Sequence, residues 1–189
     1  MWLNNWTRKL VLSFLLLVGV GSISTWALSR ALTPQAVGEA RAPDPAEYSG
    51  AVVQVYGADV WGVRGHFAIH TWVATKARGE STYRIYQVIG WKLRRSGTAV
   101  SITEGMPDKP WFRSPPILLH QVLGEAAEEL IEPIHAAALS YPYAREYTMW
   151  PGPNSNSFTA WIGLEVPQMA LQLPAKAIGE GWMHANYRN

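Results

Sequence analysis

Residues 150–158 read Trp-Pro-Gly-Pro-Asn-Ser-Asn-Ser-Phe and constrain the fold more than any other stretch of the chain. Two prolines and a glycine stiffen or turn the backbone just before Asn154, a favourable helix N-cap residue. Phe158 and Ile162 then recur with helical spacing. We therefore expect a helix that begins at Asn154. Ser155 lies in its first turn, where free N–H groups and the positive end of the helix dipole favour a developing anion.

The N-terminal region has the pattern of a membrane anchor. Leu10–Ser29 is a run of twenty uncharged residues, the length that one helix needs to cross about 30 Å of hydrocarbon. Arg8 and Lys9 precede the run, so the positive-inside rule places the N-terminus in the cytoplasm. We expect a single-pass protein of the inner (cytoplasmic) membrane whose domain lies on the outer, periplasmic side, in the cell envelope.

A cleaved signal peptide is the alternative interpretation of this segment. Its strongly apolar core, Leu10–Val20, has the length of a signal-peptide core, and Ala27 or Ala31 can precede a cleavage site. Both interpretations export the remainder of the chain. The expected parts are an anchor or signal peptide over residues 1–30, a linker rich in proline over residues 31–50 and a globular domain over residues 51–189.

Composition excludes several function classes. The chain contains no cysteine, so disulfides, thiolate catalysis and cysteine metal sites are absent. The net charge is only +2 and no basic stripe is present, so we expect no nucleic-acid partner. Aspartate occurs only at positions 44, 59 and 108, which argues against a metal site built from several carboxylates. We expect no cofactor.

The pattern after residue 50 predicts strands first and helices later, which is typical of an α+β domain with a mostly antiparallel sheet. Alternation and β-branched content predict strands over Ala51–Tyr56, Gly65–Thr75, Thr82–Leu93 and Ala99–Thr103. An apolar stripe predicts a helix with Ser114 as its N-cap that Pro133 ends or kinks. A short helix over Glu165–Leu173 and an irregular segment over Leu173–Trp182 follow.

His66 and His70 lie four residues apart on the strand expected over Gly65–Thr75. Four residues of strand span about 13 Å, too far for both imidazoles to bind one metal ion. The strand does direct both side chains to one face of the sheet. A helix packed on that face would bring Ser155 within hydrogen-bond reach of one histidine.

Residues 154–158 resemble a known catalytic element. Asn-Ser-Asn-Ser-Phe at a helix start, after a strand that bears histidine, is similar to the Asn-Cys-x-(Thr/His)-Phe element of circularly permuted papain-like proteins, which include NlpC-related and lecithin-retinol-acyltransferase-like groups. In those proteins, too, the histidine strand precedes the nucleophile helix. The resemblance implies a permuted papain-like fold in which serine replaces the cysteine.

A second resemblance covers most of the chain after the linker. The segments at residues 67–72, 88–91, 151–158 and 173–179 resemble an uncharacterised bacterial family, catalogued as domain of unknown function 3750. This resemblance implies a membrane-associated bacterial protein and supplies no established activity.

Two functions follow from these patterns. The favoured one is a non-catalytic, papain-like binding module of the envelope that uses the helix N-terminus for an anionic or carboxylate group. The alternative is a serine-dependent hydrolase or transferase of amides or esters, in which Ser155 attacks and His70, or else His66, accepts the proton. Expected partners are the membrane, through the N-terminal helix, and cell-wall peptide, lipid or an anionic ligand.

Further residues are expected to support either function. Gln87, Asp59 or Glu146 would orient the histidine. Residues expected to orient groups or bind a ligand are Asn154, Asn156, Ser157 and Gln87.

Overall fold

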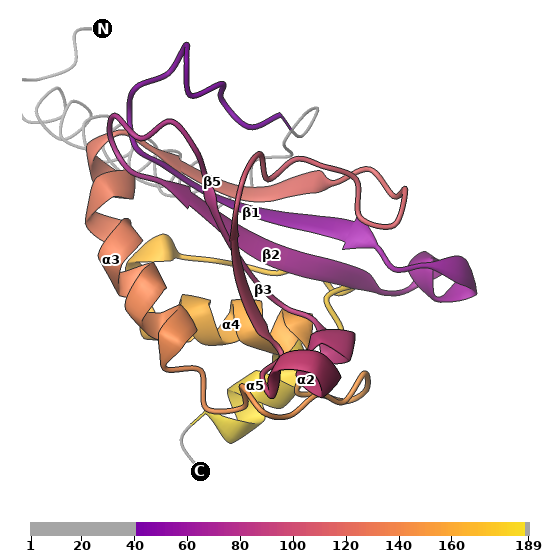
Figure 1. Cartoon of the computed structure of the whole chain (residues 1–189). Coiled ribbons are helices and arrows are strands. Elements are labelled where there is room, and N and C mark those ends of the chain that lie inside the picture. The colour runs from indigo at the N-terminus through magenta and orange to yellow at the C-terminus, as the bar shows by residue number, and fades with distance from the viewer. Residues whose placement is uncertain (1–40, 188–189) are drawn as a thin grey trace, which may run out of the picture. The chain divides into compact units, whose positions relative to one another are not determined.

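The computed structural model describes residues 41–187, which form a five-stranded antiparallel sheet accompanied by four α-helices. In chain order the elements are β1 (Val52–Asp59), the 3-10 helix η1 (Gly62–His66), β2 (Ile69–Lys76), β3 (Arg84–Val88), α2 (Gly90–Ser96), β4 (Val100–Glu104), β5 (Ile117–Leu123), α3 (Glu125–Leu139), α4 (Ser155–Glu165), the 3-10 helix η2 (Pro167–Met169) and α5 (Glu180–Asn186) (Figure 1). The predicted α+β class with an antiparallel sheet is confirmed.

The predicted anchor, Leu10–Ser29, lies outside the described residues. Among the helices that the structure describes, none combines the length and the apolar character required to span a bilayer.

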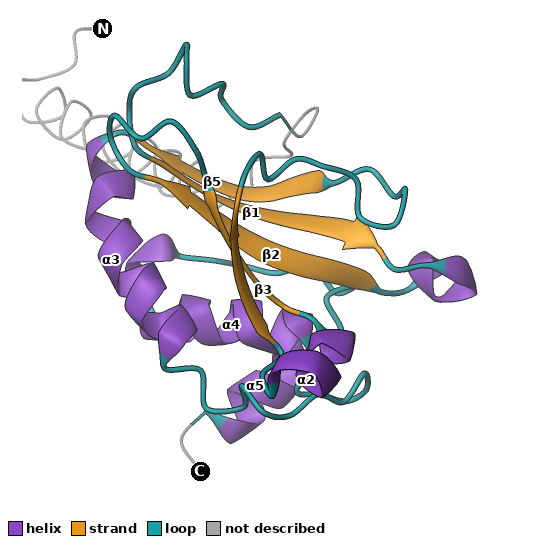
Figure 2. Ribbon diagram, in the orientation of Figure 1, coloured by secondary structure: helices purple, strands orange, loops and turns teal. Residues whose placement is uncertain are grey.

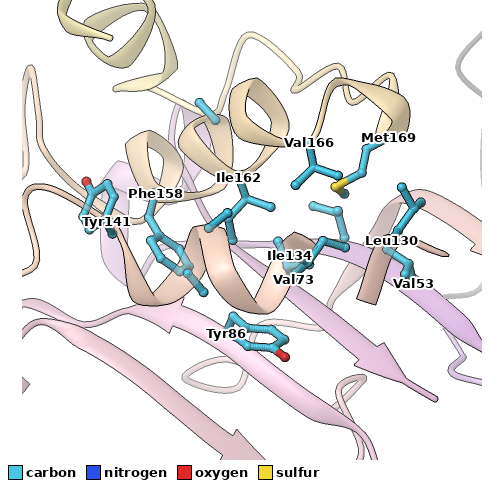
Figure 3. Packing of buried hydrophobic residues seen from close by; sticks show 14 of the residues in the cluster. Val53, Val73, Tyr86, Leu130, Ile134, Tyr141, Phe158, Ile162, Val166 and Met169 are labelled. Atoms are coloured by element: carbon cyan, nitrogen blue, oxygen red, sulfur yellow. The ribbon is translucent and has the colours of Figure 1, made fainter. Parts of the chain in front are cut away.

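The sheet has the strand order β4-β3-β2-β1-β5, and helices α3 and α4 pack on one of its faces (Figure 2). Alternate strand residues such as Val53 and Val73 meet Ile134 of α3 and Phe158 of α4 in a continuous apolar core (Figure 3). Because the side chains of a strand alternate between faces, the neighbouring residues build a second core on the opposite face. Within residues 41–187, loops rather than helices cover that second core.

The described half of the predicted linker, residues 41–50, packs against this second face. Ala42 is buried, and its N–H donates to Asp108 Oδ2 at 3.2 Å. The Tyr83 hydroxyl donates to the carbonyl of Pro43 at 2.7 Å. Residues 41–50 therefore contribute to the domain that follows them.

The strand predicted over Gly65–Thr75 begins later than expected, at Ile69. In the antiparallel register of β1 and β2, Asp59 pairs with Ile69, so residues 60–68 must form the connection between the two strands. That connection contains η1, and His66 is its last residue. The prediction that His66 and His70 share a strand face is therefore wrong.

The strand predicted over Thr82–Leu93 also ends early, at Val88, and α2 follows from Gly90. A side chain at Gly90 would lie 2.6 Å from the ring of Tyr147, so only glycine permits this close approach. Trp91 therefore lies in α2 rather than in a strand, and its side chain is half exposed.

The helix predicted from Ser114 is wrong in its first part, because residues 117–123 form β5 beside β1. A short apolar run fits a strand or a helix equally well, and here pairing with the otherwise open edge of β1 decides. Helix α3 starts after Gly124 and continues through Pro133 to Leu139. Burial of apolar residues on both sides of Pro133, Leu130 and Ile134 among them, offsets the backbone hydrogen bond that proline removes.

The C-terminal segments differ from expectation as well. Glu165 ends α4, the short helix predicted over Glu165–Leu173 is reduced to η2, and α5 occupies part of the region interpreted as irregular.

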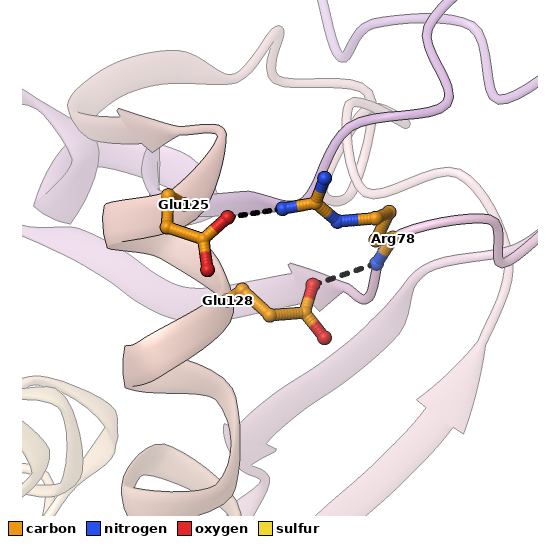
Figure 4. Close-up of polar contacts among 3 residues, drawn as sticks. All are labelled: Arg78, Glu125 and Glu128. Atoms are coloured by element: carbon orange, nitrogen blue, oxygen red, sulfur yellow. Dashed lines mark hydrogen bonds and ion pairs between the residues drawn. The ribbon is translucent and has the colours of Figure 1, made fainter.

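Arg78, in the connection between β2 and β3, joins the sheet to the start of α3 (Figure 4). Its guanidinium forms an ion pair with Glu125, and its backbone N–H donates to Glu128 Oε2 at 2.8 Å. Both carboxylates also lie in the first turn of the helix, where negative charge is favourable. The ion pair is exposed, so it contributes little stability.

Candidate functional site

Helix α4 begins with a capping box, as its sequence predicts. Asn154 is the N-cap, and its Oδ1 accepts hydrogen bonds from the backbone N–H groups of Asn156 at 2.9 Å and Ser157 at 3.2 Å. The Ser157 hydroxyl in turn accepts from the Asn154 N–H at 3.2 Å. Two of the N–H groups at the helix start are therefore used within the protein.

The cap residue also joins α4 to the neighbouring loops. Asn154 Nδ2 donates to the carbonyls of Met149 and Ile178, both at 3.0 Å. Ser157 Oγ donates to the carbonyl of Gly179 at 2.7 Å. Gly179 has φ +104°, and a Cβ there would lie 2.3 Å from Asn154 Nδ2. Glycine at position 179 is thus required both by its backbone conformation and by the close approach of the cap.

Asn156 fastens the same turn to the sheet. Its Nδ2 donates to the carbonyls of Ile69 at 3.0 Å and Ile178 at 2.8 Å. Its Oδ1 accepts from the hydroxyl of Thr71, which also lies 2.9 Å from the Thr159 hydroxyl. The polar groups of Asn154, Asn156 and Ser157 therefore serve to position Ser155.

His70 is a buried residue of β2 whose ring is held on two sides. Its Nε2 lies 3.0 Å from Gln87 Oε1, and the ring stacks on Trp111 with centroids 3.8 Å apart and planes inclined by 5°. Since an amide oxygen only accepts, Nε2 carries the proton and Nδ1 keeps a lone pair. Burial lowers the pKa of His70 to about 4, so the imidazole is neutral at pH 7.

Strands β2 and β3 pair only from Val73 to Thr75 and separate beyond that point. Thr71 and Val73 face α4, whereas His70 and Gln87 belong to the opposite face. The expectation that the helix of Ser155 packs on the His70 face is therefore wrong. The two residues still reach one pocket of about 180 Å³, because its lining includes the separated ends of both strands and the first turn of α4.

Ser155 and His70, the two potential reacting residues, both line this pocket. Within residues 41–187 neither Ser155 Oγ nor His70 Nδ1 has a hydrogen-bond partner, yet neither atom is sealed from solvent. The two atoms are not hydrogen-bonded to each other. The Ser155 N–H also has no acceptor among the described residues, so it is the first-turn donor that remains free.

The other candidates lie elsewhere. His66 is exposed on η1 and does not line the pocket. Asp59 accepts from the ammonium of Lys176 at 2.6 Å, and Glu146 is exposed. Of the three residues expected to orient a histidine, Gln87 is the one that contacts His70.

Sequence reasoning missed the aromatic lining of the pocket. Trp91, Trp111 and Phe112 contact one another, with ring centroids 5.2 to 5.7 Å apart, and Trp111 extends this cluster to His70. The ten tryptophans of the chain are the signal that the sequence offers, but their number does not distinguish core rings from pocket rings. Arg64 is the one residue with a formal charge at pH 7 in the pocket lining. Across residues 41–187 no group of three or more His, Asp or Glu side chains could hold a metal ion.

Comparison with known proteins identifies a family to which the chain is similar. A family model described as "Protein of unknown function (DUF3750)" matches residues 50–182, which is most of the chain. No curated protein and no solved structure matches the chain. The match includes β1 and the start of α4, and hence His70, Gln87 and Ser155. The chain therefore belongs to this family of proteins of unknown function, DUF3750.

Proposed function

We propose that this protein is a membrane-anchored, exported hydrolase or transferase that acts on an amide or ester, with Ser155 as nucleophile and His70 as general base. One observation carries the proposal: Ser155 and His70 line the same pocket, and Gln87 holds Nε2 of the imidazole, which leaves Nδ1 without a partner among the described residues. A nucleophile, a base and a group that orients the base are the minimum set for acyl transfer through a serine.

The chemistry assigns each group one task. Ser155 Oγ attacks the substrate carbonyl carbon as its proton passes to His70 Nδ1, and Gln87 Oε1 accepts from Nε2–H of the resulting imidazolium. The oxyanion accepts from the free Ser155 N–H. Collapse of the tetrahedral intermediate breaks the bond to the amine or alcohol, which takes the proton from His70. Water or an alcohol then releases the acyl group from Ser155.

The order of the elements supports a permuted papain-like architecture for this site. A histidine strand precedes a helix whose first residue is the nucleophile, and an amide side chain orients the histidine. A neutral orienting group stabilises an imidazolium less than a carboxylate would, so we expect slow turnover.

A module that binds anions at the start of α4 is less well supported. Asn154 Oδ1 already accepts from two of the first-turn N–H groups, and the pocket lining is chiefly apolar. A non-catalytic module for an apolar ligand is the second candidate, since the pocket itself would serve it equally well.

A fluorophosphonate probe separates the two candidates. We expect the full-length chain in detergent to form one covalent adduct at Ser155, detected by mass spectrometry of peptides. The adduct should disappear in Ser155→Ala, weaken at least tenfold in His70→Gln and persist in the control Ser140→Ala, an exposed residue at the end of α3. Absence of the adduct, or its persistence in Ser155→Ala, would leave the non-catalytic module.

Anchoring and export are supported by the uncharged run Leu10–Ser29 with Arg8 and Lys9 before it. An alkaline phosphatase fused after Arg30 should be active in bacterial cells, because that enzyme requires the oxidising periplasm. An inactive but stable fusion would reverse the proposed orientation.

A further inference from the structure

Exposed apolar side chains concentrate around the mouth of the pocket. Five large apolar residues line the pocket and are at least half exposed, and we call them the pocket rim: Trp61, Phe67, Trp91, Phe112 and Met149. Val63 and Trp150, 77% and 73% exposed, adjoin rim segments in the chain. Seven of the ten exposed large hydrophobic residues found in residues 41–187 thus belong to this one region, and a concentration of that kind marks an interaction surface.

Positive charge concentrates in the same region. The four segments that carry the rim, at residues 60–67, 90–96, 111–114 and 144–150, contain six Lys or Arg residues and one acid, Glu146. The rest of residues 41–187 contains six Lys or Arg and twelve Asp or Glu. On α2, Arg94 and Arg95 follow Trp91 by three and four residues, so they share its helix face, and all three are exposed.

We infer that the pocket rim docks on the surface of an anionic lipid bilayer, where the pocket receives the acyl chain of a lipid. Tryptophan and phenylalanine beside arginine suit the boundary between acyl chains and anionic headgroups. The docking is independent of the chemistry at Ser155, whereas a lipid ester or amide as substrate rests on the proposed function.

The size of the pocket agrees with a lipid that is enclosed only in part, with the remainder at the rim. Its volume of about 180 Å³ lies below the roughly 300–1,000 Å³ typical of pockets for drug-sized ligands, so it can enclose only part of a lipid. The remainder must lie outside, against the rim. Phe112 meets Trp91 edge to face, Trp91 stacks on Trp111 and Trp111 stacks on His70, so these rings form a continuous apolar wall from the rim to His70.

A single fluorescent label tests the docking in the full-length chain. Because the sequence contains no cysteine, Val63→Cys introduces the sole thiol, at a position exposed enough to leave packing unchanged. The matched control is Leu139→Cys, 64% exposed at the end of α3. Each variant carries an environment-sensitive nitrobenzoxadiazole label and is reconstituted into vesicles of phosphatidylcholine with about one third phosphatidylglycerol, with and without brominated acyl chains.

We expect brominated lipids to quench the label at position 63 at least threefold more than the label at position 139. The difference should fall at least twofold in vesicles of phosphatidylcholine alone and in the Arg94→Glu/Arg95→Glu double variant. Equal quenching at both positions, or no dependence on anionic lipid, would overturn the inference. A label at position 63 that is already shielded without vesicles would overturn it too, because the N-terminal segment or a second copy would then cover the rim.

A Ser155→Ala background separates this inference from the proposed function. The quenching difference should persist there unchanged, since docking does not use the hydroxyl. Docking without a fluorophosphonate adduct would contradict only the proposed enzyme activity. An adduct without docking would contradict only the proposed docking of the pocket rim on a bilayer.

Discussion

Helices α3 and α4 pack on the same face of the sheet, yet they are positioned by different forces. Helix α3 follows Gly124, has no side-chain cap and presents an acidic face to solvent. At the start of α4 a capping box and several side-chain bonds to neighbouring segments fix the first turn, and every residue from Ser155 to Ala160 is buried. Apolar burial tolerates small shifts of a helix, whereas directional bonds define the position of one atom. The first turn of α4, which carries the proposed nucleophile, is fixed by buried directional bonds, whereas the bonds of Arg78 to the start of α3 are exposed.

The largest expected effect comes from removing the cap of α4. Asn154→Ala deletes two hydrogen bonds accepted from backbone N–H groups and two donated to backbone carbonyls at a residue that is 4% exposed, so it should lower the free energy of unfolding by about 4 kcal/mol. Thermal unfolding of the full-length chain in detergent measures this. Glu132→Ala, on the exposed face of α3, should change stability by less than about 0.5 kcal/mol. Similar losses at both sites would remove the contrast between the helices.

The second effect concerns pH and the buried imidazole beside α4. Since burial lowers the pKa of His70 from 6.5 to about 4, an unfolded chain binds the proton more readily than the folded one. Stability is therefore complete above pH 6.5 and declines as the pH falls towards 4, by about 3 kcal/mol in total from this residue. In His70→Gln that part of the decline should vanish. Parallel stability curves for the wild type and His70→Gln between pH 7 and 4 would show that the imidazole is not held neutral.

Gly179 tests how tightly the loop before α5 packs on the cap. Gly179→Ala places a Cβ against Asn154 in a left-handed backbone conformation, so we expect a loss of about 2 kcal/mol. Gly97→Ala, at the end of α2, has a similar positive φ but open space around the added Cβ, and should cost only about 1 kcal/mol. Chemical denaturation distinguishes the two. Equal losses would mean that φ alone matters at position 179.

Pro133 gives the smallest effect and tests α3. Pro133→Ala restores a backbone hydrogen bond inside the helix at an exposed position, so it should stabilise the protein by about 1 kcal/mol. The fluorophosphonate reaction at Ser155 should keep its wild-type rate, because α3 does not line the pocket. A changed rate would show that the position of α3 controls the site after all.

The contrast between the helices also explains what the sequence could predict. The cap at Asn154 and the start of α4 depend on residues that are adjacent in the chain, so the sequence predicts them. The apolar run Ile117–Leu123 fits the periodicity of a helix or of a strand, and only pairing with the open edge of β1 makes it a strand. Pro133 ends a helix in isolation, yet burial around it lets α3 continue.

The candidate site, too, could be predicted only where its features depend on residues that are adjacent in the chain. Ser155, His70 and Gln87 are recognisable by residue type and order, but their meeting depends on the separation of β2 and β3, which no local pattern encodes. The prediction for His66 is wrong because a loop with alternating residue types resembles a strand in sequence. The role of Trp111 follows only from its contact with His70. Trp111 lies on a loop, and no sequence pattern identifies that loop as part of the site.

The pH profile of alkylation of Ser155→Cys by iodoacetamide tests most directly whether the side chains of residue 155 and His70 share one pocket. With no other thiol in the chain, the measured rate reports this position alone. If the two side chains share the pocket, the thiol has an apparent pKa at least one unit below the ordinary value of about 8.5, and the pKa returns towards that value when His70→Gln is added. A profile identical to that of a control thiol at Ser140→Cys would contradict it.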